Sequence, residues 1–209
     1  MSEEFGVGEL EPIIEEAWEG VRADYRKMIW YAEAEIVTSF YHNLRSNEKF
    51  RNICEKYRLI PILEYSPHKR FDAKIVRGPY PQPKHPKKQF EKYTSFDFVI
   101  IEFLEDPHNY KEHFDNWRFT YWSIEHIPLI AMEFKYPSCD EEEDLRKLER
   151  LIEAYGAKLC YFCFIAEEKP DLPKVVNEEK FRIAYGLCDN SEWGIATLAR
   201  YRTILEHEK

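Results

Sequence analysis

The chain has 209 residues and a formal net charge of −9 at pH 7, and 44% of its residues are hydrophobic. This length and composition are typical of a soluble globular protein and predict one domain over residues 1–209. No apolar run reaches the ~20 residues that a bilayer-spanning helix needs, and the N-terminus lacks a signal-peptide pattern. We therefore expect an intracellular (cytoplasmic) protein without a membrane partner, and its acidity argues against nucleic acid as a partner.

Residues 12–45 predict helix, with Gly20 dividing the stretch in two and residues 1–23 forming an N-terminal helical extension. The second part, 24–45, carries one apolar face made by Ile29, Ile36, Val37, Phe40 and Leu44. Glu33 falls inside this stripe. A carboxylate on a buried helix face is either functional or a residue at the helix edge that reaches water.

The next predicted elements are a helix over 47–57, with Asn47 as its cap, and a strand over 59–65. A further strand is expected near 71–76. Four prolines between Gly78 and Pro86 then predict irregular structure, within a basic Pro/Lys-rich loop over 77–93. Residues 69–92 hold eight basic and two acidic side chains, so the negative charge is unevenly spread.

The strand predicted over 96–103 begins with Asp97, and the strand predicted over 127–136 contains Glu133 and Lys135. Because side chains alternate along a strand, Glu133 and Lys135 share one face with Leu129 and Ala131. Met132, Phe134 and Tyr136 should point to the other face. Charges at a sheet are costly unless they pair with each other or bind something.

A helix should follow, capped by Ser138 with Glu141 and ended by Gly156. The segment 157–166, apolar except for Lys158, predicts a central strand, on which Cys160 and Cys163 face opposite ways and form neither a disulfide nor a metal site. The five cysteines of the chain are expected to be reduced. Segments 182–187 and 194–201 predict two strands, or a strand and a helix. The order indicates an α/β fold with a central mixed sheet flanked by helices.

Glu33, Asp97 and the Glu133-x-Lys135 pair together resemble the motif of the PD-(D/E)xK nuclease superfamily, which has the restriction-endonuclease-like fold. Phe96 stands where that motif has proline. Residues 32–37, Ala-Glu-Ala-Glu-Ile-Val, resemble the N-terminal helix of archaeal Holliday-junction resolvases. Asp72 is an alternative to Asp97, which we prefer because a longer apolar strand follows it and because it is nearer to Glu133.

The resemblance implies a metal-dependent nuclease that hydrolyses DNA, including branched or structured DNA, and that acts as a homodimer. Asp97 and Glu133 would hold Mg²⁺ or Mn²⁺ with the carbonyl of Phe134, and Glu33 would hold a second ion or water. Lys135 would act on the attacking water or on the charge that develops. A cation at this position stabilises negative charge on the phosphate and lowers the pKa of a bound water.

The basic stretch supplies residues that would meet DNA phosphates, unless it is only a solvated loop: Lys69, Arg70, Arg77, Lys84, Lys87, Lys88 and Lys92. Two other readings stay open. One is a catalytically inactive protein of the same fold that binds nucleic acid or protein; the other is an enzyme unrelated to nucleic acid. A zinc site at His108 and His113 is a weaker candidate. The absence of a Gly-rich phosphate loop and of Gly-x-Ser-x-Gly argues against ATP use and a serine hydrolase.

Overall fold

The computed structural model describes residues 5–27, 32–65, 96–103, 126–137 and 141–208. The strands are β1 (Leu59–Tyr65), β2 (Phe96–Phe103), β3 (His126–Lys135), β4 (Leu159–Ala166), β5 (Phe181–Leu187) and β6 (Trp193–Thr197). The helices are α1 (Glu11–Tyr25), α2 (Glu33–Ser46), α3 (Glu48–Tyr57), α7 (Glu141–Tyr155) and α8 (Leu198–Glu208), with short 3₁₀ turns η1 (Val7–Glu9) and η2 (Glu178–Lys180).

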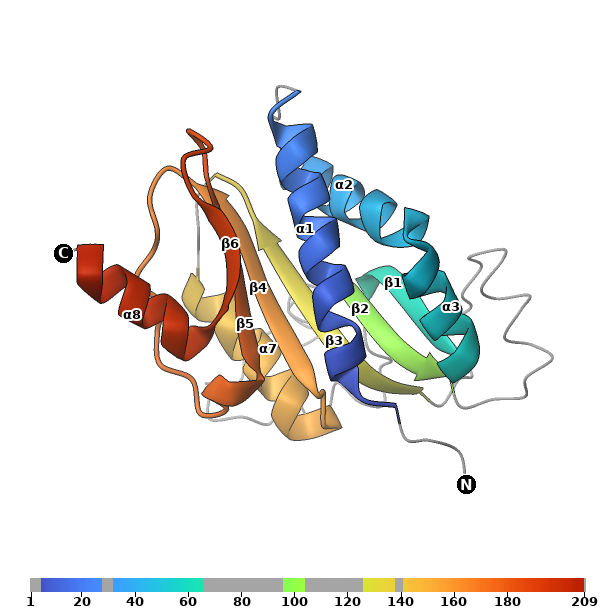
Figure 1. The fold of residues 1–209 in the computed structure, drawn as a ribbon. Helices are drawn as coiled ribbons and strands as arrows, with labels where there is room; N and C mark the ends of the chain where they lie inside the picture. Colours follow the sequence, from blue (N-terminus) through green and yellow to red (C-terminus); the bar gives the residue numbers. More distant parts are fainter. Residues whose placement is uncertain (1–4, 28–31, 66–95, 104–125, 138–140, 209) are drawn as a thin grey trace, which may run out of the picture.

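The strands form one mixed sheet in the order β1-β2-β3-β4-β5-β6. The β1–β2, β2–β3 and β5–β6 pairs are antiparallel, whereas β3, β4 and β5 run parallel. Parallel neighbours need a crossover, and α7 provides it between β3 and β4. Figure 1 shows α1, α2 and α3 in front of the sheet and α7 behind it. The predicted α/β fold with a mixed sheet between helices is therefore confirmed.

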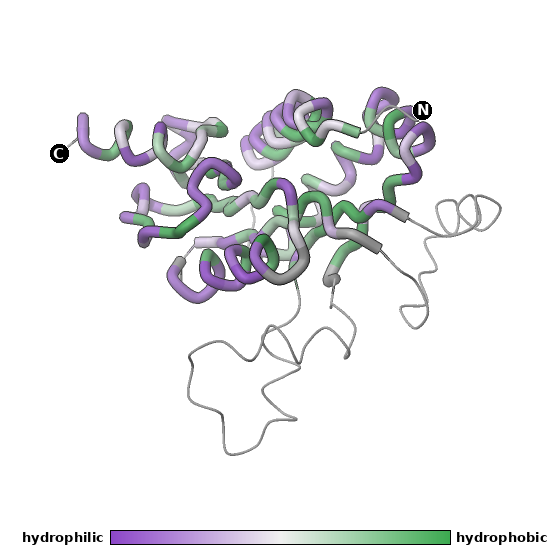
Figure 2. Tube along the Cα trace, turned by 90° about the horizontal axis from the view of Figure 1, so that it is seen from below, coloured by the Kyte–Doolittle hydropathy of each residue, from purple (hydrophilic) through white to green (hydrophobic). Residues whose placement is uncertain are grey.

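Two apolar layers hold this arrangement together, one on each face of the sheet. Helices α1, α2 and α3 bury residues such as Trp18 and Phe40 against β2, β3 and β4. On the opposite face, α7 and α8 bury Leu148 and Tyr201 among side chains of the sheet. In Figure 2 the hydrophobic residues concentrate in the middle layer and the hydrophilic ones on the outward sides of the helices. Burial of apolar surface on both faces is the main stabilising contribution.

Strand β4 is the centre of both layers, because all eight of its residues are buried. Cys160 lies in the cluster on the α7 side and Cys163 in the cluster on the α1 side, as the alternation of side chains predicted. Cys54, Cys160, Cys163 and Cys188 form no disulfide, which agrees with the expectation for these four residues. The Sγ atom of Cys160 lies 3.8 Å from the carbonyl oxygen of Leu148.

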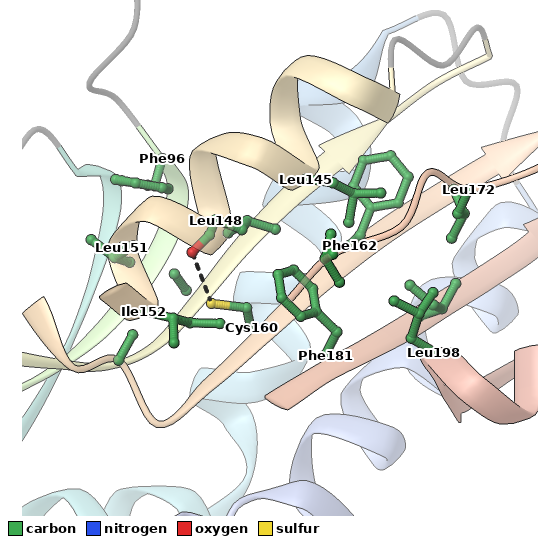
Figure 3. Packing of buried hydrophobic residues seen from close by; sticks show 14 of the residues in the cluster. Phe96, Leu145, Leu148, Leu151, Ile152, Cys160, Phe162, Leu172, Phe181 and Leu198 are labelled. Carbon is green, nitrogen blue, oxygen red and sulfur yellow. Dashed lines mark hydrogen bonds between the residues drawn. The ribbon is translucent and has the colours of Figure 1, made fainter. Parts of the chain in front are cut away.

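Helix α7 lies on the sheet through one apolar stripe. Figure 3 shows Leu145, Leu148, Leu151 and Ile152 turned toward Phe96, Cys160 and Phe162. Gly156 follows the helix with φ +71°, the left-handed conformation of a helix C-terminus, as predicted. This contact fixes the rotation of α7, so its residues 144 and 147, which border the stripe, are directed to the end of β3.

The pairing of β3 with β2 contains a register shift that the sequence analysis did not predict. Ile100 pairs with Ile130 and Ile101 with Pro128, so Leu129 is an extra residue on β3, as in a β-bulge. Leu129 consequently packs on the α1 side, and its prediction on the face of Glu133 was wrong. Ala131 does lie on the α7 side, and Met132 and Phe134 lie on the α1 side, as predicted.

The N-terminal helices have other limits than the sequence indicated. Helix α1 continues through Gly20 to Tyr25, and α2 begins at Glu33, so the predicted division at Gly20 was wrong. Gly20 serves helix packing instead, because a Cβ there would lie 2.4 Å from Cγ of Asn43 on α2. Nδ2 of Asn43 donates to the carbonyl of Ser39 at 2.9 Å and lies 3.3 Å from Oδ2 of Asp24.

We expect Gly20→Ala to lower the free energy of unfolding by about 1 kcal/mol, because Asn43 has to leave these hydrogen bonds. In an Asn43→Ala background the same change should instead stabilise the protein by about 1 kcal/mol, the ordinary preference of a helix interior for alanine. Urea unfolding of the four proteins in this cycle measures both values. Equal effects in the two backgrounds would contradict the proposed contact.

The remaining predicted elements are largely confirmed. Helix α3 is capped by Asn47, whose Oδ1 accepts a hydrogen bond from the Phe50 amide at 3.1 Å. The strands predicted over 59–65, 96–103, 127–136, 157–166 and 182–187 are present, and 194–201 contains the end of β6 and the start of α8. Within the described ranges, none of the helices is long and apolar enough to cross a bilayer. The strand near 71–76, the loop 77–93 and the cap at Ser138 lie outside the described residues.

Candidate functional site

Four elements meet where β2 begins and β3 ends. Helix α2 starts there with Glu33, and the first turns of α7 lie on the other side. The Phe98–Met132 pairing, continued by one residue, sets Asp97 opposite Glu133 on neighbouring strands. We call the cluster of Glu33, Asp97, Glu133, Lys135, Asp144 and Lys147 the carboxylate–lysine cluster. It contains the four residues that the sequence singled out and two more.

Glu133 is the most deeply buried charged residue of the cluster, with 1% of its surface exposed. Its Oε1 lies 2.5 Å from Nζ of Lys147, the ammonium that partners this carboxylate. Burial raises the pKa of Glu133 well above the usual carboxyl value, and Asp97 and Asp144 raise it further, while Lys147 opposes the shift. Charged side chains are rarely this deeply buried, and those that are need a partner of opposite charge or a metal ion.

Lys135 connects the helices on the two faces of the sheet. Its Nζ lies 3.1 Å from Oδ2 of Asp144 on α7 and 3.5 Å from Oε2 of Glu33 on α2. Burial alone would lower the pKa of Lys135, but Asp144 and Glu33 outweigh burial and raise it. Lys135 therefore stays charged, and in this arrangement it acts as a counterion rather than as a base.

Asp97 is held by the backbone of the neighbouring strand. Its Oδ2 accepts a hydrogen bond from the amide of Phe134 at 2.8 Å. In an extended strand the N–H and C=O of one residue point to the same side, so the carbonyl of Phe134 is also directed toward β2. The Asp97 carboxylate and the Phe134 carbonyl thus both lie between the two strands.

Glu33 reaches the cluster from a position other than the one predicted. It is the first residue of α2 rather than a residue inside a longer helix, and 35% of its side chain is exposed. Burial raises the pKa of Glu33, Lys135 opposes this shift, and Asp97 adds to it. Glu35, the second acid of the resolvase-like segment, caps the helix by accepting from the amide of Ala32 at 2.9 Å.

Asp144 and Lys147 were not singled out by the sequence analysis. They lie one turn apart on α7 and border its apolar stripe, and their side chains are only 13% and 17% exposed. The Nζ atom of Lys147 lies 5.2 Å from the ring centroid of Phe96 and 3.6 Å from Oδ1 of Asp144. One sequence signal could have identified them. Both residues lie beside the apolar stripe of the helix that directly follows the strand with Glu133 and Lys135.

Other candidates cannot be placed beside the cluster. Asp72, the basic residues between 69 and 92, and the histidines at 108 and 113 all lie outside the described residues. Within the described part of the chain, no three Asp, Glu, His or Cys side chains lie close enough together to hold a metal ion as they stand.

No protein-family model matches this chain, and none of the curated proteins or solved structures compared with it gives a match.

The site is therefore interpreted from its own geometry. Four carboxylates and two lysines leave a formal charge of −2, in a place where burial strengthens electrostatic interactions. Carboxylate and carbonyl oxygens are the ligands that hard divalent cations prefer, and lysine ammonium groups complement phosphate oxygens. The cluster thus combines donors for a cation with groups that suit a phosphodiester.

Proposed function

We propose that the protein is a metal-dependent nuclease of the PD-(D/E)xK type, with a restriction-endonuclease-like core, that hydrolyses DNA phosphodiester bonds. The observation that carries this proposal is the meeting of Glu33, Asp97, Glu133 and Lys135 at one end of the sheet, although they are distant along the chain. Asp97 and Glu133 lie on paired strands, and Lys135 is two residues beyond Glu133. Branched DNA, acted on by a homodimer, is the substrate that the resolvase-like segment suggests.

The donor set fits a divalent cation such as Mg²⁺ or Mn²⁺. Asp97 and Glu133 would be its main ligands with the carbonyl of Phe134, and Glu33 would hold a second ion or an outer water. The burial of Glu133 and its place opposite Asp97 on the paired strand support this assignment. When bound, the cation supplies charge stabilisation on the phosphate and a water of lowered pKa.

The protein's own groups have separate tasks in this scheme. Phe134 orients Asp97 through its amide, and Asp144 and Glu33 keep the Lys135 ammonium charged and in position. A fixed ammonium next to the scissile group stabilises the negative charge that develops during hydrolysis. The lysines and arginines between 69 and 92 would contact the DNA backbone and carry no sequence preference.

The direct test is incubation of the purified protein with supercoiled plasmid and with a synthetic four-way junction. We expect cleavage with about 5 mM MgCl₂ or MnCl₂ and none with EDTA, because the carboxylates alone repel a phosphate. Gel electrophoresis of end-labelled strands measures the products. If neither substrate is cut with either metal, the protein is not a nuclease of this type.

A catalytically inactive binding module on the same fold is the second candidate. The ion pairs of Lys147 with Glu133 and of Lys135 with Asp144 favour it, because they already balance two of the four acids without a cation. Phe96 in place of the motif proline points the same way. DNA binding in a gel-shift assay that is independent of Mg²⁺, with no effect of Mg²⁺ on the melting temperature, would distinguish this candidate from the nuclease.

A further inference from the structure

Lys147 is the residue of the cluster that the proposed chemistry does not yet use. It comes from α7, whose rotation is fixed by the packing of Leu145 and Leu148 on the sheet. Its side chain is 17% exposed, whereas that of its partner Glu133 is 2% exposed. The lysine thus reaches from a partly exposed position to a carboxylate that is almost fully buried.

The position of this ammonium conflicts with the position of a divalent cation. Mg²⁺ lies about 2.1 Å from its oxygen ligands. With Nζ of Lys147 2.5 Å from Oε1 of Glu133, an ion on that oxygen would be at most about 4.6 Å from the ammonium. Two positive charges at this separation in a buried place repel strongly, and one carboxylate cannot compensate both.

We propose that Lys147 occupies the cation position of Glu133 in the metal-free protein, so that a divalent ion binds only after the Lys147 ammonium moves away. This inference rests on the proposed metal site and adds to it a resident competitor. Lys147 stabilises the metal-free form, since without it Glu133 would be a buried charge without a partner. The same contact lowers the metal affinity. The apparent Kd is the intrinsic Kd divided by the fraction of molecules in which Lys147 has left the site.

Lys147 and Lys135 differ in this respect. Lys135 contacts Glu33 and Asp144, whereas Lys147 contacts Glu133 and Asp144. A cation held between Asp97 and Glu133 therefore displaces Lys147 first. The four methylene groups of a lysine are flexible, so the ammonium can leave Glu133 for solvent and then gives up its place 5.2 Å from the centroid of the Phe96 ring.

The test is isothermal titration calorimetry of the full-length protein with MnCl₂, which needs no substrate and no cleavage. Lys147→Met keeps the apolar stem and removes the charge, and we expect at least a tenfold lower Kd for Mn²⁺ than in the wild type. Arg146→Met is the matched control, because it removes one positive charge from the neighbouring position of α7, where the partner is the exposed Glu142. Its Kd should stay within about threefold of the wild type, since exposed charges are screened.

Two additional variants keep the result decisive. Lys147→Gln replaces Lys147→Met if the latter does not fold, as judged by circular dichroism, and should also tighten Mn²⁺ binding. Adding Glu133→Gln to either variant should abolish the gain, because the carboxylate that gains from the change is then neutral.

The outcomes separate the inference from the function it rests on. A wild type that binds Mn²⁺, with a Kd that Lys147→Met leaves unchanged or weakens, overturns the role of Lys147 and leaves the metal site intact. A wild type without detectable binding, together with a binding Lys147→Met variant, supports the inference. If the wild type, Lys147→Met and Lys147→Gln all fail to bind Mn²⁺, both the inference and the metal-dependent function are wrong.

Discussion

Glu133→Gln should lower the rate of Mg²⁺-dependent DNA cleavage by about 10³-fold, because it removes the charge of the most buried carboxylate in the carboxylate–lysine cluster. Glutamine keeps the size and one carbonyl oxygen of the side chain, so the loss should come from the missing charge. Asp97→Asn should have a similar effect, and its amide oxygen can still accept the hydrogen bond from Phe134. Single-turnover cleavage of a labelled DNA measures both rates.

Glu142→Gln is the control for this experiment. Glu142 is also a carboxylate on α7, but its side chain is 62% exposed and pairs with Arg146 at the surface. Its cleavage rate should equal that of the wild type, because exposed pairs contribute little and the residue lies outside the cluster. If the Glu133 and Asp97 variants cut DNA as fast as the wild type, the site is assigned to the wrong residues.

Mg²⁺ should stabilise the folded protein, and more strongly at pH 8 than at pH 5. At a concentration 100 times its Kd, the ion should raise the free energy of unfolding by about 2.7 kcal/mol, or the melting temperature by about 5–10 °C. Burial raises the pKa of Glu133 and of Glu33, so each holds its proton to a higher pH than in the unfolded chain. Since the cation binds the ionised carboxylates, it has to displace these protons at low pH.

The metal-free protein should show the opposite trend. A carboxyl group with a raised folded pKa contributes stability that is present below its unfolded pKa, near 4.5, and is lost as the pH rises through the folded value. The loss of stability with rising pH that is attributable to Glu133 should therefore be absent in Glu133→Gln. This variant should also lack most of the stabilisation by Mg²⁺. Differential scanning calorimetry of the wild type and Glu133→Gln at pH 5 and pH 8, with Mg²⁺ and with EDTA, measures the effects of pH and of the cation on stability. A shift by Mg²⁺ that is equal at both pH values would contradict the assigned ligands.

Much of the fold follows from local patterns. The wholly apolar segment of β4 predicts a central strand, because both faces of such a strand are buried. The cap at Asn47 and the glycine at 156 mark helix ends through backbone preferences that act locally. By contrast, neither the extra residue at Leu129 nor the role of Gly20 has a local signal, since each depends on a partner distant in the chain.

The candidate site was predictable only in part for the same reason. Glu133 and Lys135 are conspicuous as charges within an apolar strand, and Asp97 stands at the start of another. Asp144 and Lys147 lie in a highly charged helix, where their positions beside the apolar stripe are the local difference from surface residues such as Glu142 and Arg146. That difference does not show which strand end the helix meets, because this depends on how α7 packs on the sheet.

The extra residue at Leu129 has a wider consequence for how much change this strand tolerates. It shifts the phase of the strand by half a period, so the first part of β3 and the part that carries Glu133 follow different alternations against β2. Removing a single residue there would leave the composition of the strand almost unchanged but turn the buried carboxylate toward the aromatic side chains of Phe40 and Trp18. A substitution within this segment changes one side chain, whereas a change in its length changes the face of every side chain that follows.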